Sequence, residues 1–503
     1  MGEQSFTPDV RRRQEQGTRK GERVAQSRVK RPRRWSRRAQ LRKITSIGRV
    51  RRCGYCTDPS AGPTLAVTEN GDGTRTAGYG GLATCGSVWV CPQCAAKIAT
   101  GRADELSQVM RAVDEASGSA FMLTLNMRHR AGDRLGLSMS DRERLSLLET
   151  RRNRRERGQL SKKDADRLIR LEERDRQRLE ELGQAQAERD DAEALGWGVD
   201  ERQAEADSIE EAENRSRRGC WDACADGWKA VTEGRQWQAD KELFGGLLGW
   251  AKVVEVTDGL QVCDNPDCVQ RRHGNRWHVH IHALLCFTKD VPVELVCEGV
   301  GALAFGRWSR ALERHGFDAS EEHGWDMRKV RLGDGDLADY FTKVAHEVTG
   351  SHHKEGRRKG GRTPMQLLAD AVGTYRVEDL ARWWEWEAAS QRRQQLTWSR
   401  GRHDLRKLAS LGQERSDQEL AEDDIEGDVR LGIERESWDW IERSGRQCEL
   451  LDVAEENGLG GARAWLRDRG LRWVEATATT PHSSGGADVL TKAGRTDEAS
   501  AHC

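Results

Sequence analysis

Three histidines alternate with apolar residues in the stretch "RWHVHIHALL", which covers residues 276–285. Because a β-strand sends successive side chains to opposite faces, His278, His280 and His282 would line one face while the apolar side chains pack on the other. Histidines with ordinary hydrogen-bond partners are the plain interpretation, but three in one row are costly to bury without a charge or a metal ion. The stretch therefore predicts a functional site on one face of a sheet.

The spacing along this strand decides which histidines can share an ion. Neighbours on one face lie about 6.5 Å apart at the backbone, so His280 and His282 can bind the same divalent ion, whereas His278 lies about 13 Å from His282. A third ligand should come from the preceding strand, "GWAKVVEVTDG" at 249–259, which can pair with the histidine strand as a hairpin. Glu255 is the carboxylate at the centre of that strand, between two valines. We therefore expect a metal site formed by Glu255, His280 and His282.

Two Cys-x-x-Cys turns, "CGYC" and "CPQC", precede the first apolar strand. Each turn presents two thiolates toward one point, which suits tetrahedral zinc. Cys85 is a spare candidate between the two turns, and free cysteines in turns are the alternative. The expected zinc ligands are Cys53, Cys56, Cys91 and Cys94.

A second, looser set of possible zinc ligands lies in and near the loop before the histidine strand. It consists of Cys263, Cys268, His273 and His278. The chain has 13 cysteines. It shows no run of 18 apolar residues and no apolar core behind its basic N-terminus, so we expect neither a membrane helix nor a secretory signal. A cytoplasmic location follows by default, and there cysteines serve as metal ligands more often than as disulfides.

Charge is distributed unevenly although 83 Lys and Arg residues balance 83 Asp and Glu residues over the whole chain. Residues 1–53 contain 18 Lys and Arg against 4 Asp and Glu, a local excess of 14 positive charges. Such an arm should contact nucleic-acid phosphates, and a solubilising tail is the alternative.

Composition and periodicity predict an α+β protein of several segments. Its central feature would be an antiparallel sheet with the histidine strand in the middle and helices on one face. Residues 138–214 are rich in Arg, Glu, Asp and Gln, and we expect them to form a charged helical insertion, either a solvated hairpin or a coiled-coil partner site. The expected segments are a disordered basic arm at 1–48, a cysteine-rich zinc-binding segment at 49–100, a sheet domain at 101–412 containing the insertion, an acidic then helical region at 413–475, and a disordered tail at 476–503.

A tyrosine lies in a predicted helix after the histidine strand, within "GDLADYFTKVAHEV" at 335–348. Residues four before and three after a helical position share its face, so Asp336, Tyr340 and Lys343 should project together. A nearby ammonium favours the phenolate form of a tyrosine, and the same lysine could hold a phosphate oxygen. Tyr-x-x-Lys is common in ordinary helices, so it indicates a functional site only in combination with the apolar strand and the histidine strand that precede it.

These segments together resemble the replication initiators of rolling-circle plasmids, which belong to the HUH endonuclease superfamily. The similarity is greatest to the initiators of small actinomycete plasmids. Their three motifs resemble "FMLTLNMRH", "EVT…WHVHIHALL" and "YFTK" in this chain. The segments "CGSVWVCPQCAAKI" and "RTPMQLLADA…RWWEWEAASQRRQQLTWSRG" are also similar to the family. The resemblance covers residues 85–100, 118–130 and 215–402.

The resemblance implies an HUH nicking domain and a nick-and-join activity at a plasmid's double-strand origin. Tyr340 would attack a phosphodiester, become linked to the 5′ phosphate and leave a 3′-OH for extension, before the displaced strand is rejoined. His280 and His282, with Glu255 by position, would hold Mg²⁺ or Mn²⁺ to polarise the scissile phosphate. Asp336 has the helical position for a carboxylate that activates water at termination.

The same resemblance implies several partners. These are plasmid origin DNA, single-stranded or in a hairpin at the nick site, and a host helicase and DNA polymerase. No membrane partner is expected, and the sequence gives no oligomeric state.

Two other functions remain open from the residues alone. "HVHIHAL" also fits the pattern of the histidine-triad nucleotide hydrolases and transferases, in which a histidine attacks phosphorus. A non-catalytic, zinc-containing DNA-binding protein would explain the cysteines and the basic arm without a reaction.

Overall fold

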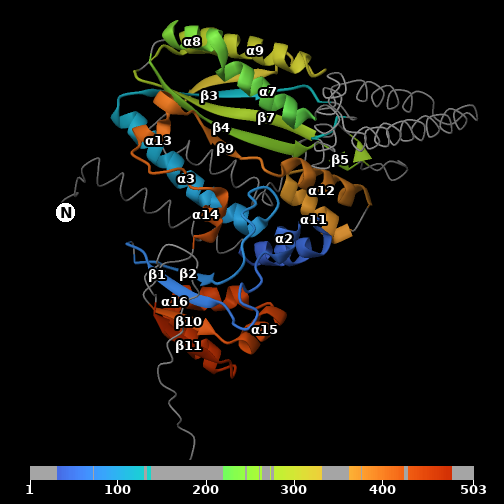
Figure 1. The fold of residues 1–503 in the computed structure, drawn as a ribbon, viewed down its shortest axis with the longest axis vertical. Helices are drawn as coiled ribbons and strands as arrows, with labels where there is room; N and C mark the ends of the chain where they lie inside the picture. Colours follow the sequence, from blue (N-terminus) through green and yellow to red (C-terminus); the bar gives the residue numbers. More distant parts are fainter. Residues whose placement is uncertain are drawn as a thin grey trace, which may run out of the picture. The chain divides into compact units, whose positions relative to one another are not determined.

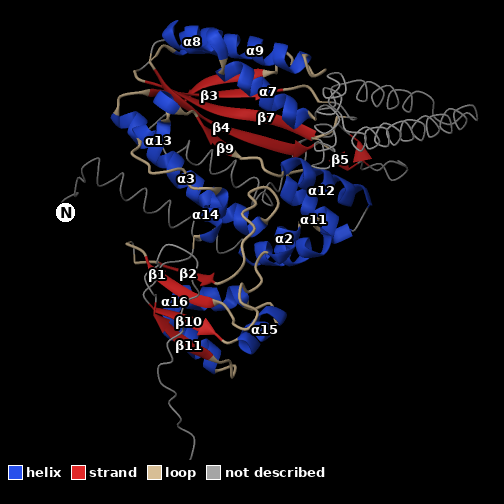
Figure 2. Ribbon diagram, viewed as in Figure 1, coloured by secondary structure: helices blue, strands red, loops and turns tan. Residues whose placement is uncertain are grey.

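The chain forms two compact units, each built from helices and an antiparallel sheet (Figures 1 and 2). One unit comprises Met1–Ile98 with Arg415–Cys503, and the other comprises Ala99–Glu414. Among the described residues, no helix combines the length and the apolar character that crossing a bilayer requires. This computed structural model describes residues 31–71, 73–129, 133–136, 219–243, 246–259, 261–262, 272–273, 277–289, 291–330, 362–374, 377–423 and 429–477.

The second unit contains a five-stranded antiparallel sheet in the order β8-β3-β7-β4-β9. The histidine strand is β7 and lies in the middle, as expected, and β4 is the strand that carries Glu255. The predicted α+β class is therefore confirmed. The strands are β3 (Ser119–Asn126), β4 (Leu247–Asp258), β7 (Trp277–Phe287), β8 (Trp325–Val330) and β9 (Leu396–Trp398), and a separate two-stranded pair is formed by β5 (Gln261–Val262) and β6 (Arg272–His273).

Helices lie against both faces of this sheet, rather than against one face as expected (Figure 1). On the face of the histidines, Leu284 and Cys286 pack with Leu106 and Val109 of helix α3 (Pro92–Glu115). On the opposite face, Trp228 of helix α7 (Cys220–Thr232) contacts the ring of Trp250 on β4. Both helices carry an apolar stripe, and a stripe does not reveal which side of a sheet it will cover.

The remaining helical segments of the second unit surround the sheet and its ends. They are α7 (Cys220–Thr232), α8 (Gly234–Leu243), the π-helix η1 (Leu295–Gly301), α9 (Ala302–Glu313), α11 (Pro364–Thr374), α12 (Val377–Ser390), the short 3₁₀-helix η2 (Gly401–His403) and α13 (Leu405–Leu408). The predicted insertion at 138–214 lies outside the described residues.

The first unit joins the cysteine-rich segment to the C-terminal region through one sheet. Leu65 of the former pairs with Leu431 of the latter, and both belong to a core that includes Trp438. The sheet has the order β11-β10-β1-β2. Its strands are β1 (Thr64–Glu69), β2 (Arg75–Gly80), β10 (Val429–Ile433) and β11 (Trp473–Thr477), and its helices include α2 (Gly48–Arg52), α14 (Asp417–Glu422), α15 (Arg435–Arg443) and α16 (Gln447–Arg467).

Part of the basic arm, for which we expected no regular structure, is helical. Residues 31–44 form a helix on which Leu41 and Ile44 are buried. The arginines that dominate the composition of this stretch conceal these apolar positions. Burial of an apolar face is what stabilises a helix of this length in a protein.

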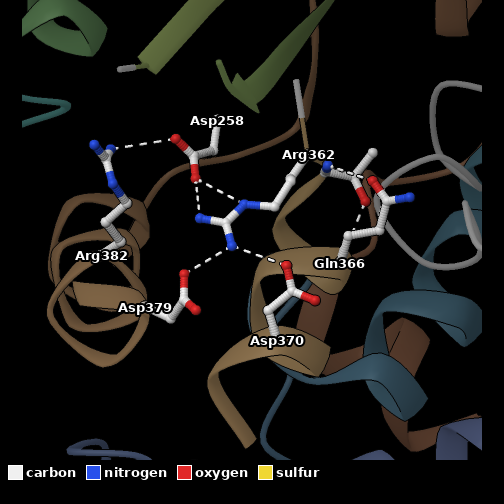
Figure 3. A network of polar contacts seen from close by, with 7 residues as sticks. Asp258, Arg362, Gln366, Asp370, Asp379 and Arg382 are labelled. Carbon is white, nitrogen blue, oxygen red and sulfur yellow. Dashed lines mark hydrogen bonds and ion pairs between the residues drawn. The ribbon is translucent and has the colours of Figure 1, made fainter. Parts of the chain in front are cut away.

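A buried network of charged side chains anchors the end of β4 (Figure 3). Asp258 accepts hydrogen bonds from the Arg362 guanidinium, including one of 3.1 Å from Nε, and forms an ion pair of 3.2 Å with Arg382. The backbones of Asp258 and Arg362 also exchange two hydrogen bonds, of 2.7 and 2.6 Å. Arg362 donates further to Asp370 and Asp379, each at 2.8 Å. Burial alone would lower the pKa of Arg362, but these carboxylates raise it above its ordinary value. The Arg362 guanidinium therefore stays protonated and positively charged.

Replacing Asp258 by Ala should lower the free energy of unfolding by about 3–5 kcal/mol, because two buried guanidiniums lose their shared anion. Asp326→Ala is the matched control, since the Asp326 side chain is 61% exposed and its ion pair with Arg328 is long, at 4.0 Å. Urea unfolding followed by tryptophan fluorescence measures both variants. Equal midpoints for the two variants would show that the network contributes little.

Candidate functional site

Glu255, His280 and His282 converge on one point at the centre of the second unit's sheet. Oε2 of Glu255 lies 2.9 Å from Nε2 of His280 and 3.1 Å from Nε2 of His282. One ligand atom from each residue lies within 4.8 Å of the other two. The three residues predicted as metal ligands are thus brought together by the fold.

The register of two strands produces this convergence. Glu255 on β4 stands directly opposite His280 on β7, and His282 is two residues further along the same face. On the other side of β7, Thr124 of β3 stands opposite His282, and its Oγ1 lies 3.0 Å from Nδ1 of that ring. Such a contact fixes the ring so that Nε2 points at Glu255, as outer-shell partners of metal-binding histidines do.

The surroundings hold the carboxylate charged and an imidazole neutral. Burial by itself would raise the pKa of Glu255, but the hydrogen bonds with His280 and His282 hold it well below its ordinary value. Burial lowers the pKa of His282. An ionised carboxylate beside a neutral imidazole is the state that binds a divalent cation. One carboxylate oxygen and two imidazole nitrogens suit Mn²⁺ and other first-row ions, and Mg²⁺ accepts such a site less readily.

His278 faces the same side of the sheet but does not join this cluster. Its ring stacks on His129 with a centroid distance of 4.5 Å and lies 4.8 Å from the ring of His280. Burial, together with the neighbouring His280 and His129, lowers the pKa of His278 to about 3. His129 was not anticipated from the sequence, although it closes the motif "FMLTLNMRH".

Two further polar residues on this face were missed from the sequence. Asn126 stands opposite His280 in the β3–β7 pairing, and Arg328 on the edge strand β8 stands opposite Met122. The positive charge of Arg328 is close enough to contribute to the lowered pKa of His282. Neither residue belongs to a recognisable spacing, so only the paired register reveals them.

Four cysteines of the first unit form a second, closed cluster. The Sγ atom of Cys53 lies 3.6 Å from that of Cys91 and 3.7 Å from that of Cys94, and Cys85 lies 3.6 Å from Cys94. A tetrahedron of zinc–sulfur bonds of about 2.3 Å has sulfur–sulfur edges of about 3.8 Å. All four residues are buried. The group therefore matches the size and the donor type of a tetrahedral metal site, and it could hold a metal such as zinc.

The membership of this cluster corrects the predicted set at one position. Cys85, the spare candidate, takes the place expected for Cys56. The backbone of Cys56 pairs with Leu82 in an isolated β-bridge, and its half-buried side chain lies outside the cluster. A Cys-x-x-Cys spacing permits convergence of two thiols but does not enforce it when a strand contact directs the chain elsewhere.

Several predicted site residues lie outside the described residues. These are Asp336, Tyr340 and Lys343 of the tyrosine helix, and Cys263 and Cys268 of the loose cysteine set. His273 belongs to the short strand β6, whose side chains are not described.

Comparison with known proteins gives one extended similarity. The chain is 24% identical over 441 residues to "Protein rep" of Streptomyces lividans, an alignment that covers 79% of this chain and 80% of that protein. It is also 32% identical over 78 residues to "Neomycin resistance protein" of Streptomyces cyanogenus, which covers 16% of this chain and 17% of that protein. No family model and no solved structure matches.

Cys85→Ser should reduce the zinc content of the purified chain by at least about half, because a ligand of the tetrahedron is lost. Cys56→Ser should leave the zinc content unchanged and is the matched control. Elemental analysis by mass spectrometry measures both. The reverse result, with zinc lost from Cys56→Ser alone, would restore the set predicted from the spacing.

His278 should make the metal-free protein less stable as the pH falls. Its pKa is about 3 when folded and 6.5 ordinarily, so between these values the unfolded chain binds a proton that the folded chain does not. This stability is therefore present above pH 6.5 and is lost as the pH falls toward 3, with a slope of up to about 1.4 kcal/mol per pH unit.

Urea midpoints measured across this range in EDTA should fall less steeply for His278→Gln than for the wild-type chain. His323→Gln, at a side chain that is 78% exposed, should keep the wild-type slope. An unchanged slope in His278→Gln would contradict the buried, neutral state of that ring.

Proposed function

We propose that this chain is a Rep-type plasmid replication initiator that nicks one DNA strand at the origin through a tyrosine and later rejoins the displaced strand. The observation that carries the proposal is the convergence of Glu255, His280 and His282 at the centre of an antiparallel sheet. The similarity to the Streptomyces lividans Rep protein over most of both chains supports it. HUH membership and the tyrosine mechanism are parts of this proposal.

In this proposal Glu255, His280 and His282 hold Mg²⁺ or Mn²⁺ at the scissile phosphate. When bound, the ion supplies Lewis-acid polarisation of a phosphoryl oxygen. The protein's own contribution is orientation. Thr124 fixes the His282 ring, and the strand register places the carboxylate between both imidazoles. Arg328, whose side chain is 61% exposed on the same face, would contact a phosphate oxygen of the strand that is cut.

Tyr340 is the proposed nucleophile. Its hydroxyl loses a proton and its oxygen forms a bond to phosphorus, while the bond from phosphorus to the 3′ oxygen breaks and the 3′ oxygen takes up a proton. The products are a 5′-phosphotyrosine link and a 3′-OH primer, and the reverse reaction rejoins a strand. Lys343 would favour the phenolate and contact a phosphate oxygen, and Asp336 would activate water at termination.

The proposed nucleophile requires that the chain from the end of β8 to Tyr340 be long enough to span the distance to the metal site. Val330 ends β8 opposite Ala120, and His280 stands opposite Asn126, six residues further along β3. The distance between Val330 and the metal site is therefore about 20 Å along the strands and about 10 Å across them. Ten residues separate Val330 from Tyr340, and ten residues can span up to about 33 Å. The number of residues between Val330 and Tyr340 therefore permits the proposed role of Tyr340.

The four-cysteine cluster is proposed to be a structural Zn²⁺ site. Its ligands are Cys53, Cys85, Cys91 and Cys94, and their burial leaves no position for a substrate. Origin DNA, a host helicase and a host DNA polymerase are the proposed partners, and the proposed location is the cytoplasm.

The two other functions predict different behaviour. A histidine-triad hydrolase needs an unengaged imidazole to attack phosphorus, yet His280 and His282 both contact Glu255. A non-catalytic DNA-binding protein would need no convergent ligand set at all. Both would leave Tyr340 without a covalent role.

Covalent capture of DNA tests the proposal. Incubation with Mn²⁺ and a library of single-stranded oligonucleotides tiled over plasmid origins should give a protein–DNA adduct on a denaturing gel. Tyr340→Phe should abolish the adduct and retain DNA binding, because the attacking oxygen is absent. Tyr375→Phe is the matched control and should behave as wild type.

The metal requirement is tested in the same assay. EDTA, or His280→Ala combined with His282→Ala, should remove the adduct, and Glu255→Gln should weaken Mn²⁺ binding at least about tenfold in calorimetry. No adduct with any oligonucleotide would refute the nickase, and cleavage that persists in EDTA would refute the metal assignment.

A further inference from the structure

One arginine of the first unit is buried without an anionic side chain beside it. Arg38, on the helix over residues 31–44, is 6% exposed and lies over the ring of Trp35 at 4.1 Å. Within the described part of the chain it forms no ion pair with a carboxylate, and its buried Nε has no hydrogen-bond partner. Guanidinium stays charged at any ordinary pH, so the fold must compensate this charge in another way.

Cysteines of the metal-sized cluster are neighbours of Arg38. Burial and the nearby Arg42 lower the pKa of Arg38, and the sulfurs of Cys53, Cys91 and Cys94 act in the opposite direction. The backbone of the first Cys-x-x-Cys turn also lies close to the guanidinium. A Cβ atom placed on Gly54 would lie 2.1 Å from the Arg38 Cζ, and Gly54 has a φ of +80°. A side chain at that position would therefore displace the guanidinium.

The charge of the cluster depends on its occupancy. Four neutral thiols give Arg38 no counter-charge, whereas four thiolates around one divalent ion carry a net charge of −2. A metal-bound cluster therefore resolves two costs together, the crowding of four sulfurs and the isolation of a buried guanidinium.

We infer that Arg38 is the cation that compensates a divalent metal–tetrathiolate centre formed by Cys53, Cys85, Cys91 and Cys94. The inference rests on the proposed zinc occupancy of that cluster and is independent of the nicking reaction. Arg38 is a positioning residue, since it acts on the metal through the thiolates. It also couples the centre to the helix at 31–44, so that metal loading stabilises the part of the basic arm that carries the exposed Arg33 and Lys43.

Zinc transfer from the full-length chain to a chromogenic chelator tests this role. Arg38→Met keeps the length of the side chain and removes its charge, so zinc should leave at least about tenfold faster than from wild type. Arg33→Met, at an exposed position on the same helix, is the matched control and should release zinc at the wild-type rate. If Arg38→Met is not obtained in soluble form, Arg38→Gln removes the charge with the same expected result.

A second background separates charge from packing. Cys85→His reduces the negative charge of the zinc centre from −2 to −1, so the effect of Arg38→Met should shrink severalfold there, whereas a packing defect would persist unchanged. Wild-type release from Arg38→Met, or an equal effect in both backgrounds, would overturn the role of Arg38. Absence of zinc from the wild-type chain would instead overturn the metal occupancy on which the inference rests.

Discussion

The antiparallel pairing of β4 with β7 is the constraint on which the candidate metal site depends. Glu255 meets His280 because the two residues are direct partners in this register. A slip of one residue would move every side chain of β4 to the opposite face and would bury the carboxylate among the apolar side chains there. The register irregularity between Leu247 and Gly249 lies at the far end of the strand, and the backbone and side chain of Asp258 fix the near end to Arg362. The network of buried charges around Asp258 thus fixes the position of β4, the strand that carries Glu255.

Much of this site follows from the sequence because a strand has only two faces. The alternation in "RWHVHIHALL" fixes which side chains of β7 point together, and the valines around Glu255 mark it as an inward carboxylate on a neighbouring strand. The sequence does not predict which face of the sheet each helix covers, since α3 and α7 have similar apolar stripes and pack on opposite sides. Asn126 and Arg328 join the same face only through pairing across strands, and His129, which follows β3, joins it by stacking on His278. Such contacts between segments have no signature in a single segment.

The cysteine cluster shows where spacing alone fails. Two turns of the same pattern predict four equivalent ligands, but only the second turn contributes both of its cysteines. Cys85 replaces Cys56 because the chain between the turns folds back, and the β-bridge of Cys56 to Leu82 belongs to that return. The helix at 31–44 was missed for a related reason. Its arginines suggest an arm in solvent, yet one of them, Arg38, is buried beside the cluster. The sequence does not predict this burial, because it depends on where the fold places the cysteines.

The two candidate metal centres differ in the property that separates a structural site from a catalytic one. Four buried sulfurs would complete a tetrahedron around a bound ion, which would then have no position for water or for a phosphate oxygen. Glu255, His280 and His282 provide three ligands whose side chains remain 8–16% exposed, and a six-coordinate ion would keep positions for other oxygens. When it holds an ion, the closed site would need charge compensation from within the fold, and this is the role that we propose for Arg38. Among the described residues, Glu255 is the one carboxylate of the open site, so a divalent ion there would keep positive charge for an anionic ligand. A phosphodiester carries the charge and the oxygens that such a site lacks.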